Sequence, residues 1–106
     1  MSNQYAKQRT IKDIENNDER IQVTGYIKDK SNNEYIMLDD KTGIIKVKIT
    51  EIEKFTYDVN DLVNVIGDLE LHTDGEKILI AQFIQDMNKL NFEYYQKLYE
   101  LKKELE

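Results

Sequence analysis

The sequence predicts an all-β barrel with helices, in which five strands close in Greek-key order, a short helix joins strands three and four, and an α-helix ends the chain. Three observations support this fold class. Residues 21–49 contain three short segments of alternating apolar and polar side chains, separated by two turn-rich breaks. Two more alternating segments follow residue 61. After residue 88 the hydrophobic period changes from two to that of a helix.

The bulk composition is that of a single globular domain with one modest core. The chain has 106 residues, of which 40% are hydrophobic and 34% charged, which is too apolar for a disordered chain and too charged for a membrane span. No apolar run reaches the about 20 residues that a bilayer crossing needs, and the N-terminus lacks a signal-peptide core. We therefore expect no membrane contact and a cytoplasmic location, or a nuclear one in a eukaryote.

Residue types for catalysis and metal binding are scarce. The chain has no cysteine and one histidine, so thiolate sites and imidazole clusters are excluded. It has neither a glycine loop that cradles phosphates nor a nucleophile elbow. The acids at residues 39–40 and 74–76 fall in turn segments, where aspartate hydrogen-bonds its own backbone. We expect no catalytic residue, no metal and no cofactor.

We expect three parts: a flexible N-terminal arm at residues 1–9, the barrel at residues 10–86, and an interaction helix at residues 87–106. The arm is polar, as frayed termini usually are. Residues 10–14 are expected to form a single turn that places Ile11 and Ile14 against one end of the barrel.

The first three strands alternate between an inner and an outer face. In the first strand, Gly25 interrupts the inner face between Val23 and Ile27, and the missing side chain lets the strand coil sharply. The second and third strands, at residues 34–39 and 44–49, point these side chains inward: Ile36, Leu38, Ile45, Val47 and Ile49. Register is well specified, because a slip by one residue would bury lysines.

Two turns and a short helix are predicted between the strands. Residues 40–43 begin with Asp and end with Gly, as a type I turn prefers. Residues 50–53 read Thr-Glu-Ile-Glu, a capping box that predicts a short helix with Ile52 and Phe55 on its packing side. Asp74 and Gly75 predict a hairpin turn.

The hairpin turn joins the last two strands, and a terminal helix follows them. The strands are expected at residues 62–71 and 77–84. The helix carries one apolar stripe formed by Leu90, Tyr94, Leu98, Leu101 and Leu105, and a second formed by Phe92, Tyr95 and Tyr99. One stripe suffices to dock a helix on its own domain. The second therefore predicts a partner, and all eight residues are candidates for that interface.

This element order is that of the OB-fold, a partly open five-stranded Greek-key barrel. Four segments resemble nucleic-acid-binding OB domains: Val-Thr-Gly-Tyr-Ile at 23–27, Tyr-Ile-Met-Leu-Asp-Asp-Lys-Thr-Gly-Ile-Ile at 35–45, Val-Asn-Val-Ile-Gly-Asp-Leu at 63–69 and Ile-Ala at 80–81. The resemblance spans about residues 10–90. Among these domains, the sequence is most similar to the middle and small subunits of replication protein A.

The resemblance implies where a single strand would bind. In the family it crosses the second and third strands and is gripped by the loops after strands one and four. By position, that surface holds Tyr26, Lys28, Lys30, Tyr35, Met37, Lys46, Lys48 and Lys77. The residues themselves fit this role, because a ring stacks on a base and a cation pairs with a phosphate.

The chain also departs from the family. Lys46, Lys48 and Gln82 stand where stacking aromatics are usual, and the net charge of −6 repels polyanions. We therefore expect weak binding of single-stranded DNA by the chain alone.

The predicted function is that of a non-catalytic single-stranded DNA-binding subunit of a replication protein A-like complex in DNA replication and repair. Its C-terminal helix would join it to other OB-fold subunits or to a second copy of itself. Two alternatives stay open: a purely architectural OB subunit that binds only protein, and an RNA-binding or anticodon-type module.

Overall fold

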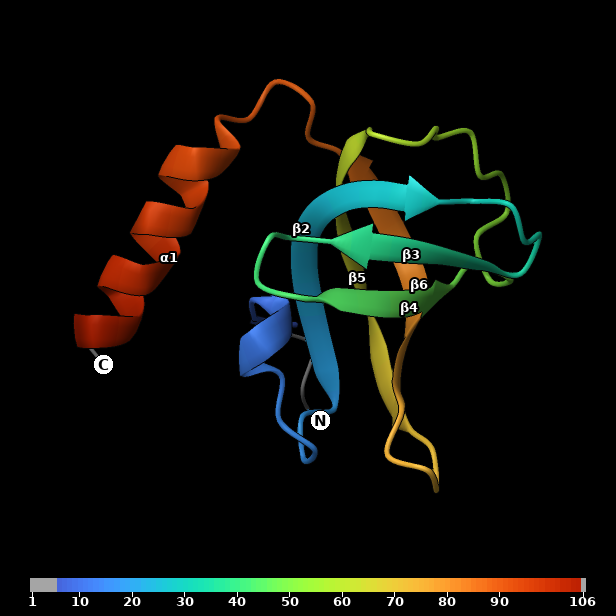
Figure 1. Ribbon diagram of the computed structural model, residues 1–106, viewed down its shortest axis with the longest axis horizontal. Coiled ribbons are helices and arrows are strands. Elements are labelled where there is room, and N and C mark those ends of the chain that lie inside the picture. Colours follow the sequence, from blue (N-terminus) through green and yellow to red (C-terminus); the bar gives the residue numbers. More distant parts are fainter. Residues whose placement is uncertain (1–5, 106) are drawn as a thin grey trace.

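The barrel is closed by five strands, as predicted. The computed structural model describes residues 6–105. The strands are β2 (Arg20–Asp29), β3 (Tyr35–Asp39), β4 (Ile44–Lys48), β5 (Leu62–Leu71) and β6 (Lys77–Asp86). They pair in the order β2-β3-β4-β6-β5, and β5 pairs back with β2 (Figure 1). Only the β4–β6 pairing among these is parallel.

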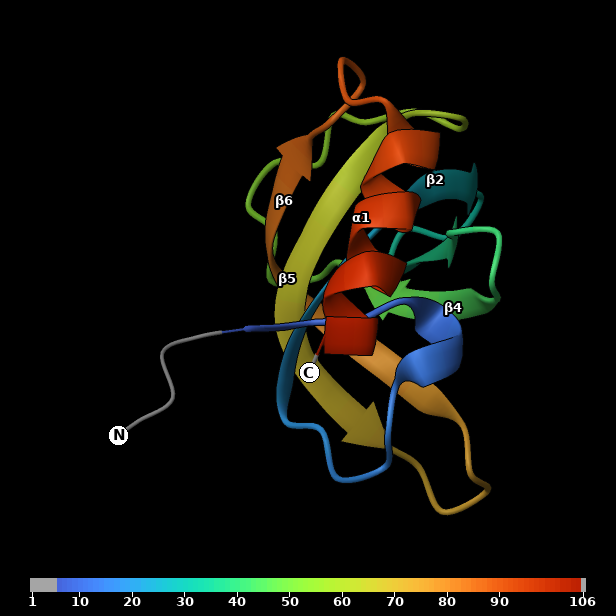
Figure 2. The ribbon, with the colours of Figure 1, turned by 90° about the vertical axis from the view of Figure 1, so that its left-hand side faces the viewer.

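Three smaller elements complete the described chain. Strand β1 (Lys7–Gln8) and the 3-10 helix η1 (Ile11–Asp13) precede the barrel, and helix α1 (Phe92–Leu105) follows it. In Figure 2, α1 lies across the outside of the barrel, close to β1 and η1. Within residues 6–105, the structure contains no helix with the length and apolar character that a membrane crossing requires.

Strand β2 bends so strongly that it pairs with β5 along its first part and with β3 along its last part. Its residues 20–26 pair with β5 and its residues 26–29 pair with β3. A Cβ added at Gly25 would lie 2.9 Å from the Asp39 carbonyl oxygen of β3. A side chain at position 25 would therefore push β3 away, which agrees with the predicted role of Gly25 in the bend.

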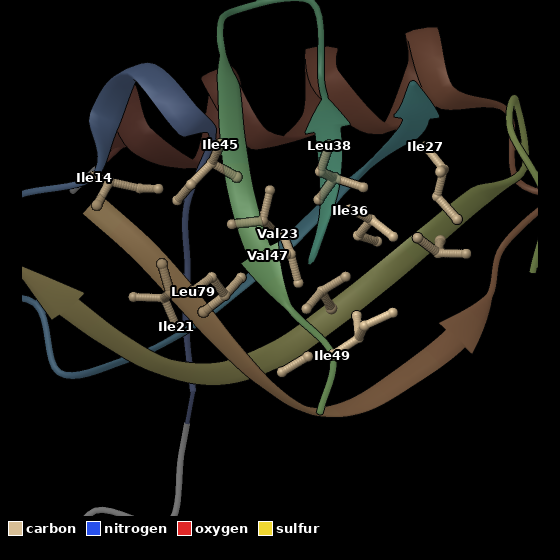
Figure 3. Close-up of a cluster of buried hydrophobic side chains, with 13 residues drawn as sticks. Ile14, Ile21, Val23, Ile27, Ile36, Leu38, Ile45, Val47, Ile49 and Leu79 are labelled. Atoms are coloured by element: carbon tan, nitrogen blue, oxygen red, sulfur yellow. The ribbon is translucent and has the colours of Figure 1, made fainter. Parts of the chain in front are cut away.

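Side chains of all five barrel strands fill the interior (Figure 3). The core cluster consists of Ile14, Ile21, Val23, Ile27, Ile36, Leu38, Ile45, Val47, Ile49, Val63, Val65, Leu79 and Ala81. The inward faces predicted for the first three strands are therefore confirmed. Ile14 closes one end of the barrel, and Ile11 packs against the same cluster from η1, as the sequence indicated.

The predicted short helix at residues 50–53 is wrong. The segment between β4 and β5 contains two turns and no helix. In the first turn the Ile52 N–H donates to the Ile49 carbonyl at 3.0 Å. Ile52, Phe55 and Tyr57 all pack against the core. A single helical turn presents one narrow face, whereas an irregular chain brings all three side chains to the barrel, so tertiary packing overrides the capping box.

The expectation of a loose arm is also wrong for residues 7–9. Lys7 and Gln8 pair in parallel with Ile21 and Gln22 of β2. Arg9 then donates two hydrogen bonds of 2.9 Å to the Asp18 carboxylate. The free edge of β2 and a buried carboxylate supply partners that polar composition does not reveal. Residues 1–5 of the predicted arm lie outside the described residues.

Candidate nucleic-acid interface and partner surface

Four of the predicted nucleic-acid-binding residues form one cluster on the outside of β3 and β4. Tyr35 pairs across the strands with Lys48, and Met37 pairs with Lys46. All four side chains are half-buried. The Lys46 Nζ lies 5.0 Å from the centre of the Tyr35 ring, within the range of a cation–π contact. A ring and two cations therefore share this face, as the sequence predicted.

The β5–β6 hairpin borders this cluster and forms a groove with it. A groove of about 280 Å³ is lined by Met37 and Lys46, by residues 75–77 of the hairpin, and by Ile11, Ile14, Ile44 and Ile45. Lys77 is thus brought to the cluster. Glu76 comes with it, and its carboxylate lies 3.6 Å from the Lys46 Nζ. The positive charge of Lys46 is therefore partly neutralised.

The first loop contributes less than expected. Lys28 is exposed at the β2 irregularity that separates Ile27 from Asp29 in the pairing with β3. The Lys30 ammonium instead donates to the Asp58 carboxylate at 3.0 Å and to the Tyr57 carbonyl at 2.9 Å. Lys30 is thereby tied to the loop between β4 and β5, a pairing between distant residues that no local sequence pattern predicts.

Tyr26 contributes to helix docking. Its ring meets the Phe92 ring edge to face, with centroids 5.2 Å apart, and the Lys41 Nζ lies 5.6 Å from its centroid. Phe92 is buried at the start of α1. Tyr26 is therefore part of the contact between α1 and β2 instead of an open stacking surface.

The second apolar stripe of α1 faces the chain's own barrel. Phe92 and Tyr99 are buried, and Tyr95 is half-buried with its ring 6.1 Å from that of Phe92. The Tyr95 hydroxyl accepts a hydrogen bond of 2.6 Å from the Gln8 amide. This stripe therefore docks the helix on β1 and β2.

The Asp13 carboxylate of η1 holds the C-terminal half of α1 in place. The Tyr99 hydroxyl and the Lys103 ammonium both donate to the Asp13 carboxylate, at 3.0 and 2.9 Å. The Lys103 hydrogen bond outweighs partial burial and lowers the pKa of Asp13. Reciprocally, the Asp13 bond raises the pKa of Lys103. Burial raises the pKa of Tyr99.

Asp40 is a structural residue whose role sequence analysis missed. It is 1% exposed, and its carboxylate accepts from the Ile11 N–H at 2.8 Å and from the Thr42 N–H and hydroxyl at 2.9 and 2.6 Å. Its carbonyl accepts from the Gln96 amide of α1. The sequence indicated only the local turn. That turn forms, but Lys41 has a φ of 75°, so it is not the predicted type I turn.

The first stripe of α1 stays on the surface. Its helical members, Tyr94, Leu98, Leu101 and Leu105, are between 43% and 80% exposed. Leu90 lies outside the helix, in a turn in which its N–H donates to the Met87 carbonyl. The helix starts later than predicted because the Asn91 side chain accepts from the Tyr94 N–H at 3.0 Å and caps it. An apolar row therefore remains unpartnered along α1.

The described residues contain no group of three or more His, Asp or Glu side chains arranged to hold a metal ion. The arrangement of residues 6–105 thus offers two surfaces: the polar and cationic face of β3–β4, and the apolar outer row of α1.

Comparisons with known proteins identify relatives of this chain. Residues 7–106 match the Ten1 protein family described as "Telomere-capping, CST complex subunit". No curated protein sequence matches the chain. Among solved structures, a chain of the S. pombe Stn1–Ten1 complex superposes with a TM-score of 0.80 at 16% identity, covering 99% of this chain and 98% of its own length.

Two further structures share the fold. The telomere capping protein Ten1 from S. pombe has a TM-score of 0.77 at 16% identity, covering 94% of this chain and 99% of its own. A chain of a replication protein A heterotrimer bound to single-stranded DNA has a TM-score of 0.59 at 16% identity, covering 76% and 66%. These structural likenesses agree with the predicted OB-fold.

Proposed function

The chain belongs to the Ten1 family of telomere-capping CST complex subunits, and from this premise we propose that it is the subunit of a replication protein A-like complex that joins a second OB-fold subunit through α1. The family is one of non-catalytic complex subunits, in agreement with the predicted absence of enzymatic activity. A telomere-capping role supports the nuclear location over the cytoplasmic one. The S. pombe relative is described as part of a Stn1–Ten1 complex, so we propose a Stn1 counterpart as the partner.

The observation that carries this proposal is the exposed row of Tyr94, Leu98, Leu101 and Leu105. The helix cannot turn this row inward, because its opposite face is already fixed to the barrel by Phe92, Tyr99 and the Asp13 contacts. A contiguous apolar row on an otherwise charged helix is typical of a helix-mediated protein interface.

Replacing both Leu98 and Leu101 with aspartate is expected to weaken partner binding by at least about 100-fold, because burying each leucine stabilises an interface by roughly 1.5–3 kcal/mol. Isothermal titration with the Stn1 counterpart of the same organism measures this change. Lys54→Asp is the control, since Lys54 is exposed in the loop between β4 and β5 and the substitution changes net charge equally. An affinity within twofold of wild type for the double variant would contradict the proposed interface.

We further propose that the β3–β4 face contacts single-stranded DNA. Tyr35, Lys46 and Lys48 support this, because they combine an aromatic ring with cations on one surface. The contact is weak in the isolated chain, since Glu76 offsets Lys46 and the domain is acidic.

Lys46→Glu combined with Lys48→Glu is expected to weaken binding of a fluorescent oligo-dT by about tenfold or more at low salt, because phosphate contacts dominate such affinity. Fluorescence anisotropy of the chain and of its complex measures the change. The matched control is Lys54→Glu with Lys89→Glu, two exposed lysines outside β3 and β4 whose replacement changes the net charge equally. Equal losses in both double variants would mean that overall charge, and not this face, governs binding.

A purely architectural role is the second candidate. It is favoured by the Lys46 ammonium, which already contacts both the Tyr35 ring and Glu76. In the same titrations, absence of binding by the complex would support this role. A preference for structured RNA over oligo-dT would support the RNA-binding alternative.

A further inference from the structure

A second cavity, formed by other residues than the β3–β4 groove, is lined by four cations. It has a volume of about 240 Å³ and lies between β1 and the C-terminal half of α1. Its lining consists of Lys7, Gln8, Arg9, Tyr99, Lys102 and Lys103. No carboxylate lines it, although acidic residues outnumber basic ones by 21 to 15 in the chain. This concentration of positive charge opposes the charge of the whole domain.

Two of these cations are held from behind by acids. Arg9 is bound by Asp18, and the two hydrogen bonds of 2.9 Å raise the pKa of the guanidinium. Lys103 is bound by Asp13 at 2.9 Å and lies 3.4 Å from Glu100. Arg9 and Lys103 are thus fixed in place by side chains that do not line the cavity.

The other two cations are not held by acids in this way. Lys7 and Lys102 are both exposed and form no ion pair within residues 6–105. The pairing of β1 with β2 places Lys7, and the docking of α1 places Lys102. Among the described residues, the cavity therefore has two cations held by ion pairs and two that form none.

The lining also indicates the kind of ligand. Tyr99 is its one hydrophobic residue, and it is buried. A protein interface needs an apolar centre, which this cavity lacks, whereas a phosphodiester backbone is bound by lysine and arginine side chains without any apolar contact. A phosphate group attached to a long polyanion fits the lining better than an acidic peptide does.

We propose that this cavity binds the phosphate backbone of single-stranded DNA, as a second contact separate from the β3–β4 face. The proposal rests on the DNA-binding part of the proposed function. Lys7 and Lys102 act as point charges toward the phosphates, and Arg9 and Lys103 add fixed positive charge beside them. Because only phosphates are contacted, the binding has no sequence preference.

The test replaces Lys7 and Lys102 by glutamine in the full chain. Lys7→Gln with Lys102→Gln is compared with Lys54→Gln with Lys89→Gln, which removes two exposed lysines elsewhere and gives the same net charge. With a fluorescent oligo-dT, the cavity variant is expected to bind about tenfold more weakly and to lower the salt slope by about 1.4, since each single-strand phosphate contact contributes about 0.7. The control is expected to stay within twofold of wild type.

Lysine footprinting supplies a readout that does not depend on mutation. In the wild-type chain, saturating oligo-dT is expected to protect Lys7 and Lys102 from acetylation, while Lys54 and Lys89 keep their reactivity. The reactivity of each lysine is quantified by mass spectrometry.

The outcomes distinguish the proposed DNA contact at the cavity from the proposed DNA contact at the β3–β4 face. Loss of binding with Lys46→Glu/Lys48→Glu but not with Lys7→Gln/Lys102→Gln would overturn the cavity and leave the β3–β4 face in place. The reverse result would support the cavity and overturn the face. Weaker binding of the Stn1 counterpart with unchanged DNA affinity would also overturn the proposal, because the cavity would then be a protein contact.

Discussion

Gly67→Ala is expected to destabilise the barrel by about 3 kcal/mol or more, at the upper end of the range for overpacking. A Cβ at this position would lie 1.9 Å from the Ile80 carbonyl oxygen and 2.7 Å from the Ile80 carbonyl carbon. Both atoms belong to the backbone of β6, so no side-chain rotation relieves the contact. The two strands must separate at the irregularity between Ile66 and Gly67, where β5 and β6 shift register.

The unfolding midpoint in urea measures this loss, and Gly75→Ala is the control. Gly75 has a φ of 90° in the β5–β6 turn but has no heavy atom within 4 Å of its added Cβ. Alanine there introduces only left-handed backbone strain, roughly 1–2 kcal/mol. If the two variants lost equal stability, the close approach of β5 and β6 at Gly67 would not be the constraint that the structure indicates.

Asp40→Ala is expected to destabilise the protein by about 3 kcal/mol, because a buried donor left without its partner costs roughly 1–3 kcal/mol. The substitution removes the acceptor of the Ile11 N–H and the oxygen that accepts from both the Thr42 N–H and the Thr42 hydroxyl. The β3–β4 turn and η1 then lose their shared anchor.

Asp39→Ala provides a matched comparison for Asp40. The neighbouring carboxylate accepts one exposed hydrogen bond from the Lys41 N–H, which water can replace, so its loss is expected to cost about 1 kcal/mol or less. Urea unfolding gives both values, and hydrogen exchange at the Ile11 amide reports the local effect. Faster exchange at Ile11 is expected only in Asp40→Ala. Similar stability losses for the two variants would rule out the anchoring role of Asp40.

The strands could be predicted because their information is local. The alternation of apolar and polar residues along β2, β3 and β4 identifies the inner face directly, and Gly25 indicates the bend without reference to the rest of the chain. The capping box at residues 50–53 failed for the opposite reason. Ile52 and Phe55 pack against a core assembled from distant strands, and no local pattern reports that contact.

The candidate surfaces were predicted in part. The two stripes of α1 follow from helical periodicity, but periodicity does not tell which stripe docks. That choice depends on Gln8 and Asp13, which hydrogen-bond Tyr95 and Tyr99 from the other end of the sequence. The cationic cavity is not predictable for the same reason, since Lys7 and Lys102 meet only after both ends of the chain have folded onto the barrel.

One consequence follows from the way α1 is held. Its inner face rests on residues near the start of the chain, and its outer face is the surface offered to a partner. Occupancy of the outer face and attachment of the first described residues are therefore thermodynamically linked. A bound partner makes detachment of β1 and η1 rarer, and trimming the chain ahead of Thr10 lowers the affinity for that partner although none of the removed residues needs to touch it.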